Sequence, residues 1–201
     1  MSTYQELKGL KIKYLSSNTS GDRAIEGEVF YNSTSGTVAS HIAAGAWSAG
    51  SNLITGQRNG AGFGTQTALV FAAGINPGGS AIATTQEYNG SGWTAGGNMN
   101  TARRLVAGCG LQTAALVYGG YVSSAQTATE HYNGSAWTAG GNLPAATYEW
   151  SGNGTQTAAL GVGGIPVDSD TTVEYNGSSW SEGGTMNTAR RQTGSFGTQT
   201  A

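Results

Sequence analysis

Tryptophan returns at nearly constant intervals through most of the chain. Four tryptophans are separated by 46, 44 and 43 residues, and each is followed nineteen residues later by a glutamine. The tryptophans are Trp47, Trp93, Trp137 and Trp180, and the glutamines are Gln66, Gln112, Gln156 and Gln199. A relation that recurs four times at this period is typical of propeller blades and similar arrays, in which each repeat is one supersecondary unit.

One repeat predicts four short strands. The expected strands are residues 104–108, 114–118, 127–132 and 136–139. A turn through GCGLQT separates the first two, and Asn133-Gly134 separates the last two. An Asn-Gly step between β-prone segments is the strongest short-range signal of a hairpin. It occurs again at Asn89-Gly90 and Asn176-Gly177. The apolar second strand of each repeat favours burial on both faces.

The composition agrees with many tight turns. Glycine accounts for 34 of the 201 residues, and it recurs with the repeat. No segment combines helix caps with an amphipathic pattern. We therefore expect an all-β fold of four-stranded antiparallel blades with a short N-terminal extension. A ring of six or seven such blades needs about 260 to 310 residues, so the chain is either part of a propeller or a four-bladed ring.

The repeat resembles the kelch motif: an apolar strand ending in Gly-Gly, a tyrosine, a tryptophan and then Met-Pro-x-x-Arg. This sequence has AALVYGG followed by EHYNGSAW, and elsewhere EYNGSGWTAGGNMNTARR and EYNGSSWSEGGTMNTARR. The matching structural positions are the four tryptophans with Tyr88, Tyr132, Tyr175, Arg58, Arg104 and Arg191. Asn100 and Asn187 replace the proline, and Tyr148 stands where the third repeat should have arginine. The resemblance implies blades that the three arginines help to hold together, although these arginines could instead bind an anion.

Residues 1–40 lie outside the repeat, so we expect two parts, 1–40 and 41–201. The segment from Leu10 to Leu15 alternates apolar and polar residues, which predicts an edge strand. The following EGEVFYNSTSGT resembles a short element near the N-termini of bacteriophage tail-fibre and related virion proteins. The resemblance implies a segment that attaches the protein to a virion. The alternative is a degenerate hairpin of the first blade. Lys8, Lys11 and Lys13 are all the lysines of the chain and are candidate docking residues.

Charge and cysteine content restrict the other possibilities. The net charge of −2 and the pI of about 5.6 argue against nucleic-acid binding, which requires a basic face. No stretch predicts membrane insertion or a secretory signal. Cys109 is the only cysteine, so no disulfide forms within the chain, and we expect a buried thiol. No nucleophile, base and orienting group can be assembled, so we expect neither an enzyme nor a metal or other cofactor.

The loop between the second and third strands varies most among the repeats. In an up-and-down blade, this loop emerges on the face opposite the GTQT and YNGS turns. Variable loops on a rigid scaffold usually carry recognition. We therefore take Asn76, Tyr121 and Asp168 as candidate ligand-binding residues.

The expected function is that of a structural and adhesion component of a bacteriophage tail, such as a tail fibre. Its N-terminus would dock to other tail proteins of the virion, after assembly in the host cytoplasm. Its repeats would face a glycan or protein of the host surface. We also expect a homo-oligomer. The alternative is a free glycan-binding lectin of propeller type.

Overall fold

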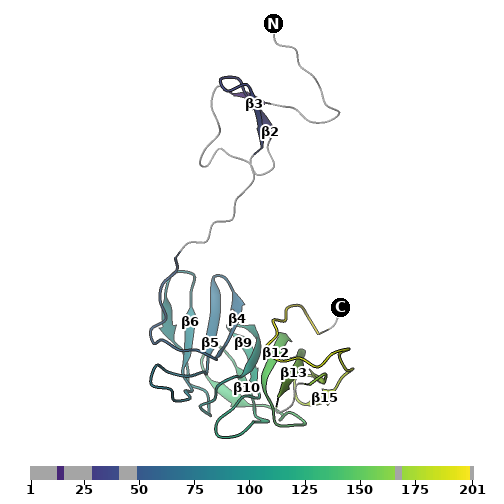
Figure 1. Cartoon of the computed structure of the whole chain (residues 1–201). Helices are drawn as coiled ribbons and strands as arrows, with labels where there is room; N and C mark the ends of the chain where they lie inside the picture. Colours follow the sequence, from purple (N-terminus) through teal and green to yellow (C-terminus); the bar gives the residue numbers. More distant parts are fainter. Residues whose placement is uncertain (1–12, 16–28, 41–48, 166–168, 200–201) are drawn as a thin grey trace. The chain divides into compact units, whose positions relative to one another are not determined.

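The computed structural model describes residues 13–15, 29–40, 49–165 and 169–199. These ranges contain fifteen strands and no helix. The strands form one three-stranded sheet and three four-stranded sheets, and every pairing within the four-stranded sheets is antiparallel. The expectation of an all-β fold built from four-stranded blades is confirmed (Figure 1).

The chain divides into two compact units, Met1–Ala49 and Gly50–Ala201, where the sequence suggested a division after residue 40. The first unit contains β1 (Lys13–Leu15), β2 (Val29–Asn32) and β3 (Thr37–Ser40). Strand β1 lies at the edge of this sheet and pairs in parallel with β2. The rest of the expected strand, residues 10–12, lies outside the described residues.

The YNSTSGT motif forms the hairpin between β2 and β3. The Asn32 side-chain oxygen accepts hydrogen bonds from the backbone N–H groups of Thr34 and Ser35, at 3.0 and 3.1 Å. Gly36 closes the turn with φ +70° and donates its N–H to the Asn32 carbonyl at 2.9 Å. Each of these residue types therefore has a local role in making the turn.

The second unit consists of three blades, each a four-stranded meander whose spatial order follows the chain. Blade 1 contains β4 (Ala61–Thr65), β5 (Ala68–Ala72), β6 (Thr85–Tyr88) and β7 (Trp93–Ala95). Blade 2 contains β8 (Ala107–Leu111), β9 (Ala114–Tyr118), β10 (Thr129–Tyr132) and β11 (Trp137–Ala139). Blade 3 contains β12 (Tyr148–Gly154), β13 (Ala159–Ile165), β14 (Thr172–Tyr175) and β15 (Trp180–Glu182).

The expected second strand of blade 2 agrees with β9 at both ends, but the expected first strand was placed three residues too early. Residues 107–111 form β8, and the turn contains only Gln112 and Thr113. The expected turn, GCGLQT, included most of β8 because glycine is uncommon in strands. Gly108 is required there because an added Cβ would lie 2.7 Å from the Phe63 ring of blade 1.

The blades pack with their first strands together. Strand β8 contacts both β4 and β12. One buried cluster joins blades 1 and 2 through Phe63, Val117 and Trp137, and a second joins blades 2 and 3 through Tyr118 and Trp180. Apolar side chains between successive blades therefore form the core, as expected of a partial propeller.

A ladder of backbone hydrogen bonds connects the entrances of the first strands. Leu105 N–H donates to the Asn59 carbonyl at 2.7 Å, and Glu149 N–H donates to the Leu105 carbonyl at 3.0 Å. Gln192 N–H continues the ladder to the Glu149 carbonyl at 3.2 Å. All four residues have φ between 51° and 60°, although none is glycine. The same backbone conformation thus recurs once per repeat and marks the approach to a fourth position at Gln192.

Candidate recognition face

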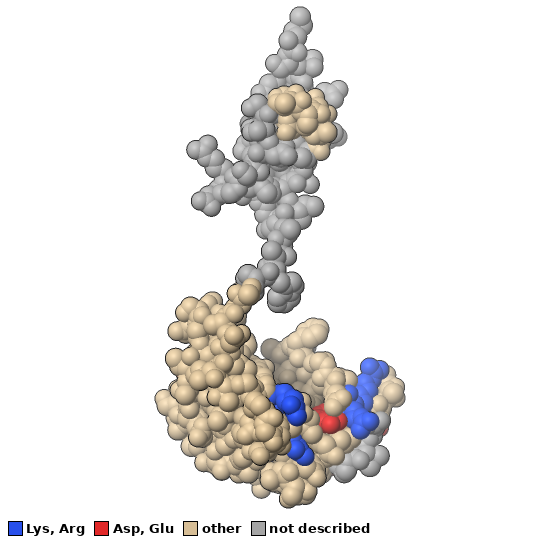
Figure 2. Space-filling view, turned by 60° about the vertical axis from the view of Figure 1, so that its left-hand side comes forward, with Lys and Arg blue, Asp and Glu red and all other residues tan. Residues whose placement is uncertain are grey.

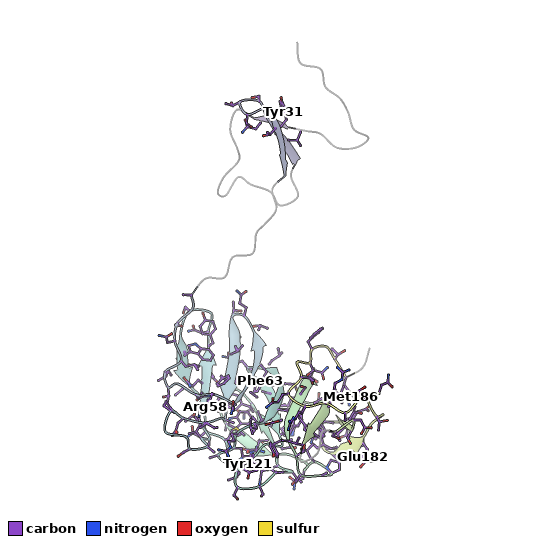
Figure 3. All side chains as sticks on the ribbon, viewed as in Figure 1. Tyr31, Arg58, Phe63, Tyr121, Glu182 and Met186 are labelled. Atoms are coloured by element: carbon purple, nitrogen blue, oxygen red, sulfur yellow. The ribbon has the colours of Figure 1, made fainter. Side chains whose placement is uncertain are left out.

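The connections between the second and third strands of each blade lie at the end opposite the Gln112–Thr113 turn, because the strands alternate in direction. The segment of chain that leads into blade 1 or blade 2 pairs with this connection at the same end of the blade. Arg58 forms an isolated bridge with Ile75, and Arg104 forms one with Tyr121. Figure 3 shows Tyr121 away from the tips of β4 and β5. We call this end, with Arg58, Arg104, Tyr121 and Tyr148, the recognition face.

Three side chains from two blades meet on the recognition face. The guanidinium carbon of Arg104 lies 5.1 Å from the centre of the Tyr121 ring. The Tyr121 ring lies 5.1 Å from that of Tyr148 of blade 3, in an edge-on arrangement. All three side chains are half-buried. The group therefore combines a cation with two aromatic rings that are partly open to solvent, which suits stacking and hydrogen bonding rather than bond cleavage.

The arginine that holds the blade together is Arg103, one residue before the position expected from the sequence. Its guanidinium is fully buried and forms a 2.6 Å ion pair with Glu130 on β10. It also donates hydrogen bonds of 2.8 Å to the carbonyls of Gly119 and Ala128. Burial lowers the pKa of Arg103, and Glu130 opposes this shift. In blade 2 the buried structural arginine is therefore Arg103 and not Arg104, which stood at the expected position.

Arg58 and Arg191 are exposed, and Arg104 is half-buried. The sequence signal for the buried arginine was its partner: Glu130, on the third strand of blade 2, forms the ion pair with Arg103. In blade 1 the two positions hold Gln57 and Gln86, whose side chains bond at 2.9 Å. The equivalent pair in blade 3 is Thr147 and Val173. The two positions thus change together: the pair is polar in blade 1, charged in blade 2 and nearly apolar in blade 3.

Asn76 has a structural role in its loop. Its side-chain oxygen accepts a 2.9 Å hydrogen bond from Ser80 N–H, which closes the loop between β5 and β6. Asp168, Lys8 and Lys11 lie outside the described residues. The backbone of Lys13 belongs to β1. Of the candidate binding and docking residues, the described structure thus brings Tyr121 together with other side chains suited to recognition.

The repeat tryptophans and tyrosines lie between blades. Trp137 and Trp180 are buried, as are Tyr132 and Tyr175, with which they form close ring pairs. Trp93 and Tyr88, their counterparts in blade 1, are only half-buried. Trp137 and Trp180 each pack on the blade that precedes their own. Trp93 belongs to the first described blade and has no preceding blade to cover it, which explains its greater exposure. Trp47 lies outside the described residues.

The repeat glutamines connect the backbones of successive blades. Gln112 donates hydrogen bonds to the carbonyls of Leu69 and Tyr88 in blade 1, at 3.3 and 3.0 Å. Gln156 repeats this with the carbonyls of Ala115 and Tyr132 in blade 2, at 2.9 and 2.7 Å. Their constant distance from the tryptophan was the sequence signal for this role.

Cys109 and His131 of the second unit are held in packed surroundings. Burial raises the pKa of the Cys109 thiol to about 12, so the thiolate is not available near neutral pH. Burial lowers the pKa of His131, whose Nε2 lies 2.8 Å from the Tyr175 hydroxyl. Within the described residues, no three His, Cys, Asp or Glu side chains come together as a metal site would require. Figure 2 shows only a few small patches of charge on the viewed face of this unit.

The described ranges also contain no helix long and apolar enough to cross a bilayer. No protein-family model matches the chain. No match was found among curated proteins.

Proposed function

We propose that the protein is a non-enzymatic recognition component of a bacteriophage tail that presents its recognition face to the host surface. The observation that carries the proposal is the group formed by Arg104, Tyr121 and Tyr148. Aromatic rings bind the apolar faces of sugar rings, and a neighbouring guanidinium binds carboxylate or hydroxyl oxygens. The preferred ligand is therefore a surface glycan.

Two further features support this assignment. The bridges of Arg58 with Ile75 and of Arg104 with Tyr121 pair the segments entering blades 1 and 2 with the connections between their second and third strands, so the side chains of the recognition face are held in place before a ligand arrives. In addition, the first unit contains the YNSTSGT hairpin, whose sequence resembles the attachment segments of virion proteins. That resemblance favours a virion component over a free lectin with the same recognition face.

The test is adsorption of virions to host cells. Particles carrying Tyr121→Ala together with Tyr148→Ala should adsorb on the order of tenfold less, since each lost contact costs about 1 kcal/mol and several copies act together. The matched control is Thr113→Ala with Thr157→Ala, because both threonines are exposed on the opposite end of the blades. Unchanged adsorption by the tyrosine variant would refute the proposed recognition face.

The attachment role has a separate test. A chain that lacks residues 1–40 should remain soluble and should be absent from purified virions. Equal incorporation of the shortened and full-length chains would contradict virion docking, and binding to a glycan array without incorporation would favour the free lectin.

A further inference from the structure

The contacts between blades follow a rule that the structure repeats at both internal junctions. The indole N–H of Trp137 donates to the Thr85 hydroxyl of the preceding blade at 2.9 Å. Trp180 does the same to Thr129, also at 2.9 Å. The repeat-equivalent threonine of blade 3 is Thr172, on the face that would receive a following blade. Its hydroxyl donates to the Gly184 carbonyl, which leaves the oxygen able to accept a hydrogen bond.

The tyrosine contact obeys the same rule. Tyr132 donates its hydroxyl to the Glu87 carboxylate of the preceding blade at 2.5 Å. The Tyr175 hydroxyl lies 2.8 Å from His131 Nε2. The next acceptor in the series is Glu174, which is exposed. At the other end of the series, Tyr88 of blade 1 donates to the carbonyl of Gly90 in its own turn, at 2.9 Å.

Trp93, Trp137 and Trp180 are each followed four residues later by a glycine, and this position lies where a following blade comes close. A Cβ added at Gly97 would overlap the Ser135 carbonyl of blade 2, and one added at Gly141 would overlap the Ser178 carbonyl of blade 3. The third member, Gly184, would meet nothing within 4 Å. Nothing in the packing of blade 3 itself therefore requires a glycine at this position.

The two outer faces of the array thus carry opposite halves of one interface. The trailing face of blade 3 offers the acceptors Thr172 and Glu174, and beside it lies a groove of about 520 Å³ lined by Val162, Met186 and Arg190. The leading face of blade 1 offers the donors Trp93, Tyr88 and Gln66. Trp93 currently donates to the carbonyl of Ser51 at 3.2 Å.

We propose that two copies of this chain join head to tail, each leading face on the other's trailing face, and close a six-bladed ring. Trp93 would bond to Thr172 of the second copy, and Tyr88 to Glu174 of the second copy. Gln66 would bond to the carbonyls of Ala159 and Tyr175 of the second copy, as Gln112 and Gln156 do within the chain. Six blades lie within the usual range of four to eight for propellers. A head-to-tail contact whose rotation closes gives a discrete ring rather than a fibre.

Docking requires an exchange of segments, since residues 50–57 of one copy and 183–190 of the other hold the same repeat position. Backbone N–H groups of Gly183, Met186 and Arg190 bond to blade 3, so residues 183–190 stay. Most of residues 50–57 is exposed, with Ile54 at 58%, and this segment is displaced. Its displacement breaks the hydrogen bonds of Thr55 and Gln57 with Gln86 and the bond from Trp93 to the Ser51 carbonyl. Residues 191–199 also leave, because β4 of the second copy takes their position, and the bonds of Gln192 with Glu149 and of Thr193 with Ser151 break. Their single large apolar side chain, Phe196, is 96% exposed.

The experiment uses the full-length protein. Sedimentation equilibrium from about 1 to 200 μM should give a mass twice that of the 20.3-kDa chain. A Gly184→Leu variant should be monomeric, because the added side chain occupies the place of the incoming blade. Gly194→Leu is the matched control: an added Cβ there also meets nothing within 4 Å, and the residue lies in the displaced segment, so this variant should still dimerise.

A cross-link tests the geometry directly. In a chain carrying Ser91→Cys and Gly184→Cys, the two cysteines should form disulfides between copies, because Ser135 and Ser178 hold the equivalent place beside Gly97 and Gly141. Cross-linked dimers from the double variant, with none from either single variant, are expected. A monomeric wild-type protein, a dimer that tolerates Gly184→Leu, or a cross-link within one chain would each overturn the proposal.

Discussion

At the residue scale, the Arg-Arg pair of blade 2 shows how neighbouring identical side chains acquire different roles. Arg103 is buried against Glu130, and Arg104 lies over Tyr121 on the recognition face. The sequence could not distinguish them, since the kelch pattern supplies one arginine and the register is uncertain by one residue. What separates them is the direction of the backbone at the entrance to the blade, which only the structure provides.

Removing one member of the buried ion pair should be costly. Arg103→Thr leaves Glu130 buried without its cation, and we expect a loss of about 3–5 kcal/mol in the free energy of unfolding. Arg103→Thr combined with Glu130→Val installs the pair found in blade 3 and should recover most of that loss. Urea denaturation measures both variants. If the double variant were less stable than the single one, the pair would not be the interacting unit.

His131 should make stability depend on pH. Burial lowers its folded-state pKa below the usual value of about 6.5. The unfolded chain therefore binds the proton more readily, so the contribution of neutral His131 is complete above about pH 6.5 and falls as the pH drops toward the folded-state pKa. The urea midpoint of the wild type should decrease from pH 7.5 to 5.5. The same change in His131→Gln should be smaller, and equal changes in the two proteins would contradict this role.

At the element scale, the strands that the sequence predicted best are those defined by apolar runs and Asn-Gly turns. Strand β9 was predicted at both ends, and β10 and β11 within two residues. The Asn-Gly turn differs from the turn with two positive φ angles that this pair usually forms. Only Gly134 has a positive φ, of +91°, and the Asn133 side chain accepts hydrogen bonds from the N–H groups of Ser135 and Ala136. Strand β8 was misplaced because Gly108 is required by the Phe63 ring of the neighbouring blade, which local propensity does not reveal. The recognition group was not predictable as a group, since Tyr148 comes from a different blade.

The position of each fourth strand in the array should decide how much its tryptophan matters. Trp137→Ala on β11 should cost about 3–5 kcal/mol, because the indole is buried and bonded to blade 1. Trp93→Ala on β7 should cost clearly less, since this side chain is half-buried. Chemical denaturation of the two variants, at protein concentrations too low for dimers to form, compares their free energies of unfolding. Equal losses would mean that blade 1 is covered on its leading face.

At the scale of the whole molecule, the chain is two units with different construction. The first is a small sheet of three strands, and the second is an array in which each blade packs on the one before it. The period of the tryptophans predicted the array correctly, because it reflects the contact that blades 2 and 3 each make with the blade before them. The sequence divided the chain after residue 40, where the repeat begins, and the boundary between the two compact units falls after Ala49.

The second unit should fold without the first. A chain that begins at Gly50 should keep a β-rich circular dichroism spectrum and unfold in one cooperative transition, since the described core clusters lie wholly within residues 50–201. A deletion of the same 49 residues that abolished the transition would show that the first unit completes the array.

Gly62, Gly108 and Gly152 occupy the same repeat position in the first strands, and a Cβ at each would press against an aromatic ring, within its own blade at Gly62 and of the preceding blade at Gly108 and Gly152. Missing side chains at the axis, together with tryptophans farther out, make each blade thinner at its inner edge than at its outer edge. A stack of such wedges must curve, and the angle per blade is set by the difference in thickness. A change from glycine to alanine at positions 108 and 152 would therefore push the first strands of successive blades apart and widen the arc, whereas at position 62 it would press on Phe71 within blade 1.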